Sequence, residues 1–294
     1  MIKIAIPGRF DGAALGRIGR EVLPEGKKNP PKNIQFDFSA LNFIEPTGIV
    51  FLSNLIKWAN LNGSEVNLVG IDDRNKSILY LDDALFFEQH LGKKLNYSSR
   101  TRSTTCPLKM IDHSESHAWF ERELIPWLSR TININHASLY LIKACCSEIF
   151  NNINDHSQQN IGSLFMQYFP ATKTISISAA DFGVGIPENV RSICPGISDN
   201  QAIIQAAKEG FTTKSVPGNR GIGLDYVIRA VAFEYQGAVT IYSAGGRIKF
   251  YRSENRIRSF SFKDNGFCPG TTFELSIPTN AIPIITDDPE DMAW

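Results

Sequence analysis

Short runs of alternating apolar and polar residues, separated by helical patterns, fill the first third of the chain. The alternating runs cover residues 2–6, 34–39 and 65–71. Each run predicts a strand, since side chains on a strand point alternately to opposite faces. Apolar residues recur at helical spacing over residues 50–59, before Asn62 and Gly63, and again over 77–90. Strands that alternate with helices predict an α/β layer domain over residues 1–94.

The order is reversed in the second half of the chain, where helical patterns precede the alternating runs. Helices are predicted over residues 116–128, with an interruption at Pro126, and over residues 136–155. The strands that follow are predicted at residues 163–169, 173–181, 238–244, 247–252 and 271–277. Residues 185–237 are predicted to form a long flexible segment and one helix that begins near Gly223. Helices followed by a mostly antiparallel sheet predict a two-layer α/β sandwich.

A polar stretch, NYSSRTRSTT at residues 96–105, separates the two patterns and has the composition of an exposed linker. We therefore expect a linker over residues 95–115. The second domain is expected over residues 116–280, followed by a C-terminal tail at residues 281–294.

Composition narrows the class of protein further. The 294 residues are 43% hydrophobic, and Lys+Arg and Asp+Glu both count 30, so no net charge favours nucleic acid or an acidic membrane surface. No apolar run approaches the roughly 18 residues that a membrane-spanning helix needs. The five cysteines are odd in number and lack CxxC spacing, which argues against a disulfide framework or a structural zinc site. We expect a cytoplasmic protein with reduced thiols, whose partner is neither a membrane nor a nucleic acid.

Three polar patterns occur in order along the second half, and each suits one part of a nucleotide. Glu148 and Asn152 share a helix face, where a carboxylate can orient a water and an amide oxygen can bind Mg²⁺. Asp181 ends a predicted strand and can accept an amino hydrogen of a base, and the glycines of DFGVGI let backbone approach a ligand. The stretch GNRGIGL, residues 218–224, runs into a helix and exposes backbone N–H groups to an anion.

Together these patterns resemble the GHKL ATPases, the family of DNA gyrase, mismatch-repair ATPases, heat-shock chaperones, histidine kinases and anti-sigma-factor serine kinases. The stretches EIFNNINDHS, DFGVGI and GNRGIGL are similar to the N, G1 and G2 boxes of that family. CPGTTFELSIP at residues 268–278 is similar to its last motif. The resemblance covers residues 116–278 and implies the GHKL (Bergerat) fold with ATP and Mg²⁺ as ligands.

The resemblance also implies roles for individual residues. Glu148 would be the general base or the carboxylate that orients a water, and Asn152 would be the Mg²⁺ ligand. Asp181 would accept from the adenine amino group, with Gly183 and Gly185 shaping the base pocket. The G2 residues expected at the phosphates are Gly221, Ile222, Gly223 and Leu224. Further nucleotide contacts are expected from Asp155, Ile186 and Thr272, with Thr271 as the alternative to Thr272.

Residues 187–217 would form the lid over the nucleotide in this family. The candidates for contact with the γ-phosphate are Thr212, Thr213, Lys214 and Arg220. A solvated position suits Lys214 equally well. The chain departs from the usual histidine kinases, because none of His113, His117 and His136 is followed directly by an acidic residue.

The first half carries a second resemblance, in FDFSALNFIEPTGIVFLSNLIKWANLNGSEVNLVG at residues 36–70, to STAS domains, the fold of anti-anti-sigma factors. In that family a strand leads to Asp-Ser-Ser/Thr-Gly, and a partner GHKL kinase phosphorylates the first serine. Here Glu45 replaces the aspartate and Pro46 the acceptor, so the usual phosphorylation cannot occur. Thr47 remains as an acceptor near a helix N-terminus, but we favour the alternative that Pro46 simply begins the helix.

The two resemblances together predict a regulatory protein of the anti-sigma serine-kinase type, with its STAS-like domain fused in cis. Its activity would be ATP hydrolysis or serine/threonine phosphorylation, and a protein partner would bind through the STAS-like domain. Two alternatives stay open: a non-catalytic switch in which ATP orders the lid, and a dimerising clamp ATPase. A homodimer is open as well.

Overall fold

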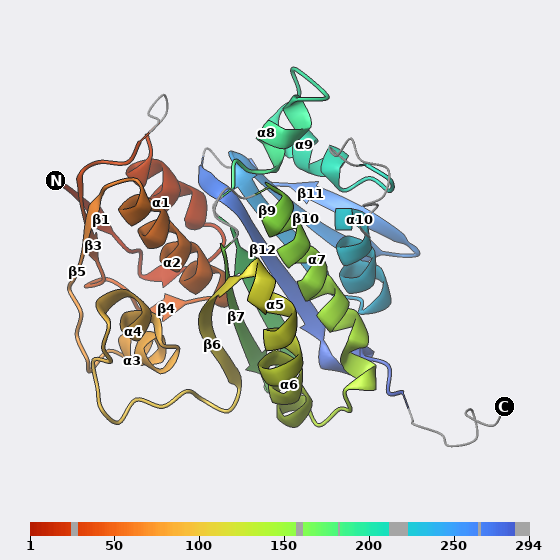
Figure 1. The fold of residues 1–294 in the computed structure, drawn as a ribbon, viewed down its shortest axis with the longest axis horizontal. Coiled ribbons are helices and arrows are strands. Elements are labelled where there is room, and N and C mark those ends of the chain that lie inside the picture. Colours follow the sequence, from red (N-terminus) through yellow and green to blue (C-terminus); the bar gives the residue numbers. More distant parts are fainter. Residues whose placement is uncertain (25–28, 157–160, 182, 212–222, 264–265, 286–294) are drawn as a thin grey trace.

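The computed structural model describes residues 1–294 except 25–28, 157–160, 182, 212–222, 264–265 and 286–294. For residues 154–156 and 161 it describes only the backbone. The mixed α/β class predicted from the sequence is confirmed, with a parallel sheet in the first half and an antiparallel sheet in the second (Figure 1). No helix in the described part is long and apolar enough to cross a membrane.

The N-terminal half, residues 1–94, is built on a three-stranded parallel sheet. Its strands are β1 (Ile2–Ala5), β3 (Asn33–Asp37) and β5 (Glu65–Val69), in the order β1-β3-β5. Two shorter strands, β2 (Arg9–Phe10) and β4 (Phe43–Ile44), pair separately in parallel. The helices are α1 (Leu15–Val22), α2 (Pro46–Leu61), α3 (Lys76–Asp83) and α4 (Phe86–Leu91). The three main strands and α2 lie where the hydrophobic pattern predicts them, whereas α1, β2 and β4 are additional.

Helix α2 is the longest helix of the N-terminal half. Pro46 lies in its first turn, after an extended Glu45, as expected if the proline simply begins the helix. Twelve of its sixteen residues are buried, which is far more than the single stripe that a surface helix buries. Helix α2 must therefore lie between two layers of the molecule.

The second half carries a seven-stranded antiparallel sheet in the order β11-β10-β9-β12-β8-β7-β6. Its strands are β6 (Thr105–Asp112), β7 (Ile161–Phe169), β8 (Thr174–Ala180), β9 (Ala238–Ala244), β10 (Gly246–Ser253), β11 (Arg256–Ser261) and β12 (Cys268–Pro278). The edge strands β6 and β11 lie outside the predicted strands. Residues 105–112 belong to the sheet and not to the predicted linker, because Cys106, Leu108 and Ile111 are buried in it.

Helices cover one face of this sheet, and their apolar side chains share one buried core with it. In chain order they are α5 (His113–Trp119), a π-helical turn (Phe120–Leu124), α6 (Ile125–Ile132), a 3-10 turn (Ala137–Leu139), α7 (Tyr140–His156), α10 (Gly223–Ile228) and a second π-helical turn (Arg229–Glu234). Pro126 lies in the first turn of α6, so the predicted interruption at this proline is the start of a helix.

The N-terminal half covers the opposite face of the seven-stranded sheet (Figure 1). Helix α2 packs on β7, β8 and β12 of that sheet while its other side packs on β5. The core of the N-terminal half also includes five residues from strands of the seven-stranded sheet: Leu108, Phe165, Ala180, Tyr242 and Cys268. The predicted two-layer sandwich therefore has further layers behind its sheet, formed by α2 and the parallel sheet.

Two helical segments differ from their predictions. The predicted helix over residues 77–90 is divided into α3 and α4 at Leu85, whose φ of 65° lies in the left-handed region. The segment that follows Gly185, predicted to be flexible, contains α8 (Ile186–Arg191) and α9 (Asp199–Ala206). Ser198 and Gln201 form a capping box at the start of α9, which is a signal the sequence does carry.

Candidate functional site

The carboxylate of Asp181 lies directly after β8, near the centre of the seven-stranded sheet. Its Oδ1 accepts hydrogen bonds from the backbone N–H groups of Gly183 (2.6 Å) and Thr271 (3.1 Å). Within the described residues no hydrogen bond reaches Oδ2. One oxygen of this carboxylate is therefore fixed by the backbone, and the other is able to accept a hydrogen bond from a ligand.

Burial dominates the electrostatics of this group. It raises the pKa of Asp181 to about 6, and the hydrogen bonds from Gly183 and Thr271 oppose that rise. The carboxylate is therefore mostly ionised at neutral pH, yet close to its titration range. A buried acceptor of this kind suits a ligand amino group, and such shifted groups gather at functional sites.

Glycines keep the backbone close together around Asp181. Gly185 has a φ of 86°, and a Cβ there would lie 2.7 Å from the Ser243 hydroxyl. Gly270 has a φ of 69°, and a Cβ there would lie 2.3 Å from the carbonyl oxygen of Asp181. Both positions accept no larger residue without displacement, which explains why the sequence has glycine at each.

Glu148 forms the second part of the candidate site. It is buried on α7, and its Oε1 accepts a hydrogen bond from the backbone N–H of Gly223 at 3.0 Å. Gly223 has a φ of 78° and is the first residue of α10. This contact joins the predicted N box to the predicted G2 box, which lie 75 residues apart in the chain.

Asn152 follows Glu148 on α7 by about one turn and is half-buried, and its role as a Mg²⁺ ligand stays a prediction. The neighbouring Asn151 has a structural partner, since its Oδ1 lies 3.1 Å from Nε2 of His113. Asp155 lies in α7, but its side chain is outside the described part of the chain. No group of three or more His, Cys, Asp or Glu residues suited to a metal occurs among the described residues.

The other predicted contacts fall on different parts of the structure. The backbone N–H of Ile186 donates to the Ser243 hydroxyl at 2.9 Å, and the side chain of Leu224 belongs to the core under the helices. Thr272 pairs across the sheet with Ala180, which belongs to the core of the N-terminal half. Its hydroxyl lies 3.4 Å from Sγ of Cys268, which belongs to the same core. The structure brings the backbone N–H of Thr271 to the Asp181 carboxylate, whereas the side chains of Thr271 and Thr272 lie on opposite faces of the sheet, toward Ser243 and Cys268 respectively.

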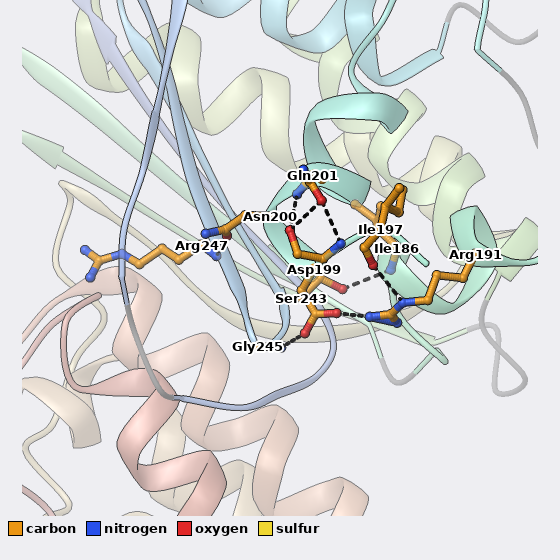
Figure 2. Close-up of polar contacts among 10 residues, drawn as sticks. Ile186, Arg191, Ile197, Asp199, Asn200, Gln201, Ser243, Gly245 and Arg247 are labelled. Atoms are coloured by element: carbon orange, nitrogen blue, oxygen red, sulfur yellow. Dashed lines mark hydrogen bonds and ion pairs between the residues drawn. The ribbon is translucent and has the colours of Figure 1, made fainter. Parts of the chain in front are cut away.

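The segment with α8 and α9 is fastened to the turn between β9 and β10 (Figure 2). The backbone N–H of Gly245 donates to Oδ2 of Asp199 at 2.7 Å, and that of Arg247 donates to Oδ1 of Asn200 at 2.9 Å. Arg191 forms an ion pair with the same Asp199 carboxylate. The first part of the predicted lid is therefore attached to the sheet at several points.

The remaining predicted contacts lie outside the described residues. They are Thr212, Thr213, Lys214, Arg220, Gly221 and Ile222. The predicted lid over residues 187–217 is thus described only as far as Phe211.

Sequence reasoning missed two residues that contact the predicted site, Ser243 and Asn54, and named Thr271 only as the alternative to Thr272. Ser243 binds the start of α8, and the backbone of Thr271 binds Asp181. Asn54 of α2 donates from Nδ2 to the backbone carbonyl of Asp181 at 2.6 Å. A polar residue inside an apolar helical run was the only signal for Asn54, and the sequence does not say what that residue meets.

Comparison with known proteins adds a distant likeness to solved structures. No family model matches the chain, and no match was found among the curated proteins searched. Among solved structures, the B-subunit of DNA gyrase from Myxococcus xanthus is similar with a TM-score of 0.31 and 10% sequence identity, over 61% of this chain and 47% of that chain. A TM-score of this size establishes no common fold, so the class that stands is the broad one, a mixed α/β protein. The chain matches about half of the gyrase subunit's length.

Proposed function

We propose that this chain is an ATP- and Mg²⁺-binding regulatory protein of the GHKL type, with ATP hydrolysis or serine/threonine phosphorylation as its reaction. The observation that carries the proposal is the contact between motifs that are distant in sequence. Glu148 of the N box binds Gly223 of the G2 box, and Asp181 of the G1 box binds Thr271 of the last motif. Unrelated chance matches would have no reason to fold into contact in these pairs.

The residues suit the separate parts of ATP. Oδ2 of Asp181, to which no described residue donates a hydrogen bond, would accept the adenine amino group, and the backbone N–H of Gly223 would turn from Glu148 to a phosphate. Mg²⁺ would need phosphate oxygens in addition to the Asn152 amide, as is usual for this ion, and would neutralise phosphate charge. Glu148, once released from Gly223, would orient the attacking water or protein hydroxyl.

A second candidate function is a non-catalytic, ATP-gated switch. It is supported by the contact of Glu148 with Gly223, which engages the only carboxylate proposed to activate a nucleophile. Nucleotide would replace that contact and thereby change the position of α10 and the lid. The dimerising clamp ATPase stays a prediction without a specific structural observation in its favour.

The proposed regulatory module is the STAS-like N-terminal half. The first turn of α2, where the related domains carry their phosphorylated serine, is buried here, and Thr47 is only 1% exposed. A protein partner would therefore bind another surface of this half, or would first have to separate it from the sheet.

The test of nucleotide binding is titration of the full chain with ATP and Mg²⁺ by calorimetry. Asp181→Asn should weaken ATP binding by roughly 10- to 100-fold, because a hydrogen bond to an ionised acceptor is lost. Asp37→Asn is the matched control, since Asp37 ends a strand of the other sheet and is paired with Lys3. Equal affinity in Asp181→Asn and the wild type would remove the proposed base contact.

The reaction is tested with γ-labelled ATP. Label on the chain or on an added protein supports phosphorylation, and free phosphate alone supports hydrolysis. Glu148→Gln should lower the rate of either reaction by roughly 100-fold or more, while ATP still binds. Binding without any turnover in the wild type would favour the switch.

A further inference from the structure

A polar side chain lies in the middle of the apolar contact between α2 and the seven-stranded sheet. Asn54 is 2% exposed, and its neighbours Leu52 and Leu55 are part of the core. An amide buried in this way costs free energy unless it is hydrogen-bonded. Its Nδ2 donates to the Asp181 carbonyl at 2.6 Å, and its Oδ1 lies 3.5 Å from the Ser163 hydroxyl.

The shorter of these two hydrogen bonds is the one to Asp181, the residue whose carboxylate faces the candidate nucleotide site. Asp181 is held at three places: its N–H donates to the Thr271 carbonyl at 2.9 Å, its Oδ1 accepts two backbone N–H groups, and its carbonyl accepts from Asn54. The first two restraints come from the second half of the chain itself. The third comes from the N-terminal half, 127 residues earlier in the sequence.

The carbonyl matters for the carboxylate because both groups belong to Asp181. The peptide group of this carbonyl leads toward Gly183, whose N–H fixes Oδ1. Gly270 lies so close that a Cβ there would be 2.3 Å from the same carbonyl oxygen, which leaves little room for another donor. Without Asn54 the buried carbonyl would have lost its donor, and rotation of this peptide would move the N–H of Gly183 and with it the carboxylate.

We propose that Asn54 is a positioning residue of the nucleotide site: it orients Asp181 from behind the sheet and so sets selectivity for the adenine amino group. The N-terminal half is then a structural part of the ATP site and not a separate module tethered to it. Release of α2 from the sheet weakens ATP binding, and by linkage ATP tightens the contact of the two halves. The inference rests on the proposed function.

The experiment compares ATP with purine riboside triphosphate, which lacks only the 6-amino group. The ratio of their dissociation constants measures the contact of that amino group with Asp181. It is determined for the full-length wild type, for Asn54→Leu, which has similar volume and no donor, and for Thr47→Val. Thr47 is the matched control, because its hydroxyl lies 3.1 Å from that of Ser178 in the same buried contact of α2 with β8, without touching Asp181. Thermal unfolding is followed for each variant, and Asn54→Ala replaces Asn54→Leu if the leucine prevents folding.

We expect the wild type to prefer ATP by roughly tenfold or more, Asn54→Leu to lose most of that preference, and Thr47→Val to keep it. A lower unfolding temperature of Asn54→Leu with an unchanged ratio would overturn the positioning role and leave Asn54 structural. An equal loss of preference in Thr47→Val would show general loosening and also overturn it. A wild type that binds ATP no more tightly than purine riboside triphosphate, or does not bind ATP, would instead overturn the proposed adenine contact itself. That outcome is seen in the wild type alone, so it is distinguishable from failure of the positioning role of Asn54.

Discussion

The two faces of the seven-stranded sheet use polar residues in different ways. Toward the helices, the sheet is apolar until its strands end, and there Asp181 presents an oxygen without a protein partner among the described residues. Toward the N-terminal half, polar side chains such as Ser163 and Ser178 lie fully buried beneath α2 and are paired with Asn54 and Thr47. The first face leaves hydrogen-bonding capacity for a ligand, whereas the second uses it to attach one half of the chain to the other.

Strand β8 shows how one segment serves both faces. Ile175, Ile177 and Ala179 belong to the core under the helices, and Ala180 belongs to the core under α2. Period-two alternation thus separates a face of large side chains from a face of small ones. The small face lets a helix approach the backbone closely, which is what the Asn54 contact requires.

The largest expected effect tests whether the second face is a true core. Phe165 is fully buried on the face toward the N-terminal half, where its ring meets that of Tyr80 at 6.3 Å. Phe165→Ala should reduce the free energy of unfolding by about 3–5 kcal/mol in chemical denaturation. Met166→Ala, which truncates the adjacent residue on the helix face, is the matched comparison at about 2–5 kcal/mol. A cost below about 1 kcal/mol for Phe165→Ala alone would mean that the two halves are only loosely associated.

The next effect concerns the loss of folding stability caused by burying the ionised carboxylate of Asp181 on the face toward the helices. The pKa of Asp181 is raised from 3.8 to about 6 by burial, so its contribution to stability is greatest below pH 4 and is lost as the pH rises through 6. Asp181→Asn carries no such charge and should have a larger free energy of unfolding than the wild type at pH 8, by on the order of 1–3 kcal/mol. The advantage should shrink as the pH falls from 6 to 4. A variant that is less stable at pH 8 would show that the carboxylate is not under electrostatic strain.

The same pKa sets a pH dependence of ligand binding. Protonation of Asp181 removes the acceptor for an amino group, so ATP affinity should fall below pH 6, by up to about tenfold per pH unit. Calorimetric titrations between pH 5 and 8 measure this slope. Purine riboside triphosphate has the same phosphates and no amino group, so any slope it shares with ATP comes from the phosphates and not from Asp181.

The smallest effect is expected at Thr47. Thr47→Val keeps the shape of the side chain and removes one buried hydrogen bond, with an expected cost of about 1 kcal/mol in the free energy of unfolding. Because Thr47 is buried, mass spectrometry after incubation with ATP and Mg²⁺ should find no phosphate on it in the folded chain. Stoichiometric phosphate on Thr47 would show that the two faces of the sheet separate readily.

The sequence predicted the elements far better than their assembly. The alternation in TISISAA located β8, and the apolar spacing located α2 and α7, because local pattern determines which face of an element is apolar. The polar face of β8, with its serines, has the pattern of a solvent-exposed face, so nothing local predicts that α2 covers it. The contact of Asn54 with Asp181 depends on packing between segments 127 residues apart, which no local pattern encodes.

For the candidate site, too, the sequence predicted individual residues but not how they pack together. The motifs singled out Glu148, Asp181 and Gly223, and the structure brings Glu148 into contact with Gly223, whereas the roles of these residues toward a nucleotide stay predictions. Choosing between Thr271 and Thr272 required the register of β12 against β8, which the sequence does not give. The capping box of α9 was readable but was hidden in a segment rich in polar residues.

The shared core beneath α2 has a consequence for synthesis of the chain. The N-terminal half leaves the ribosome before the second half, yet its core is completed by residues of β7, β9 and β12 that are made much later, the last of them Cys268. Until those strands arrive, the apolar side of α2 has no layer to cover it and is open to chaperones or to other chains. Of the two halves, the one that is translated earlier is therefore completed only after most of the later one has been made.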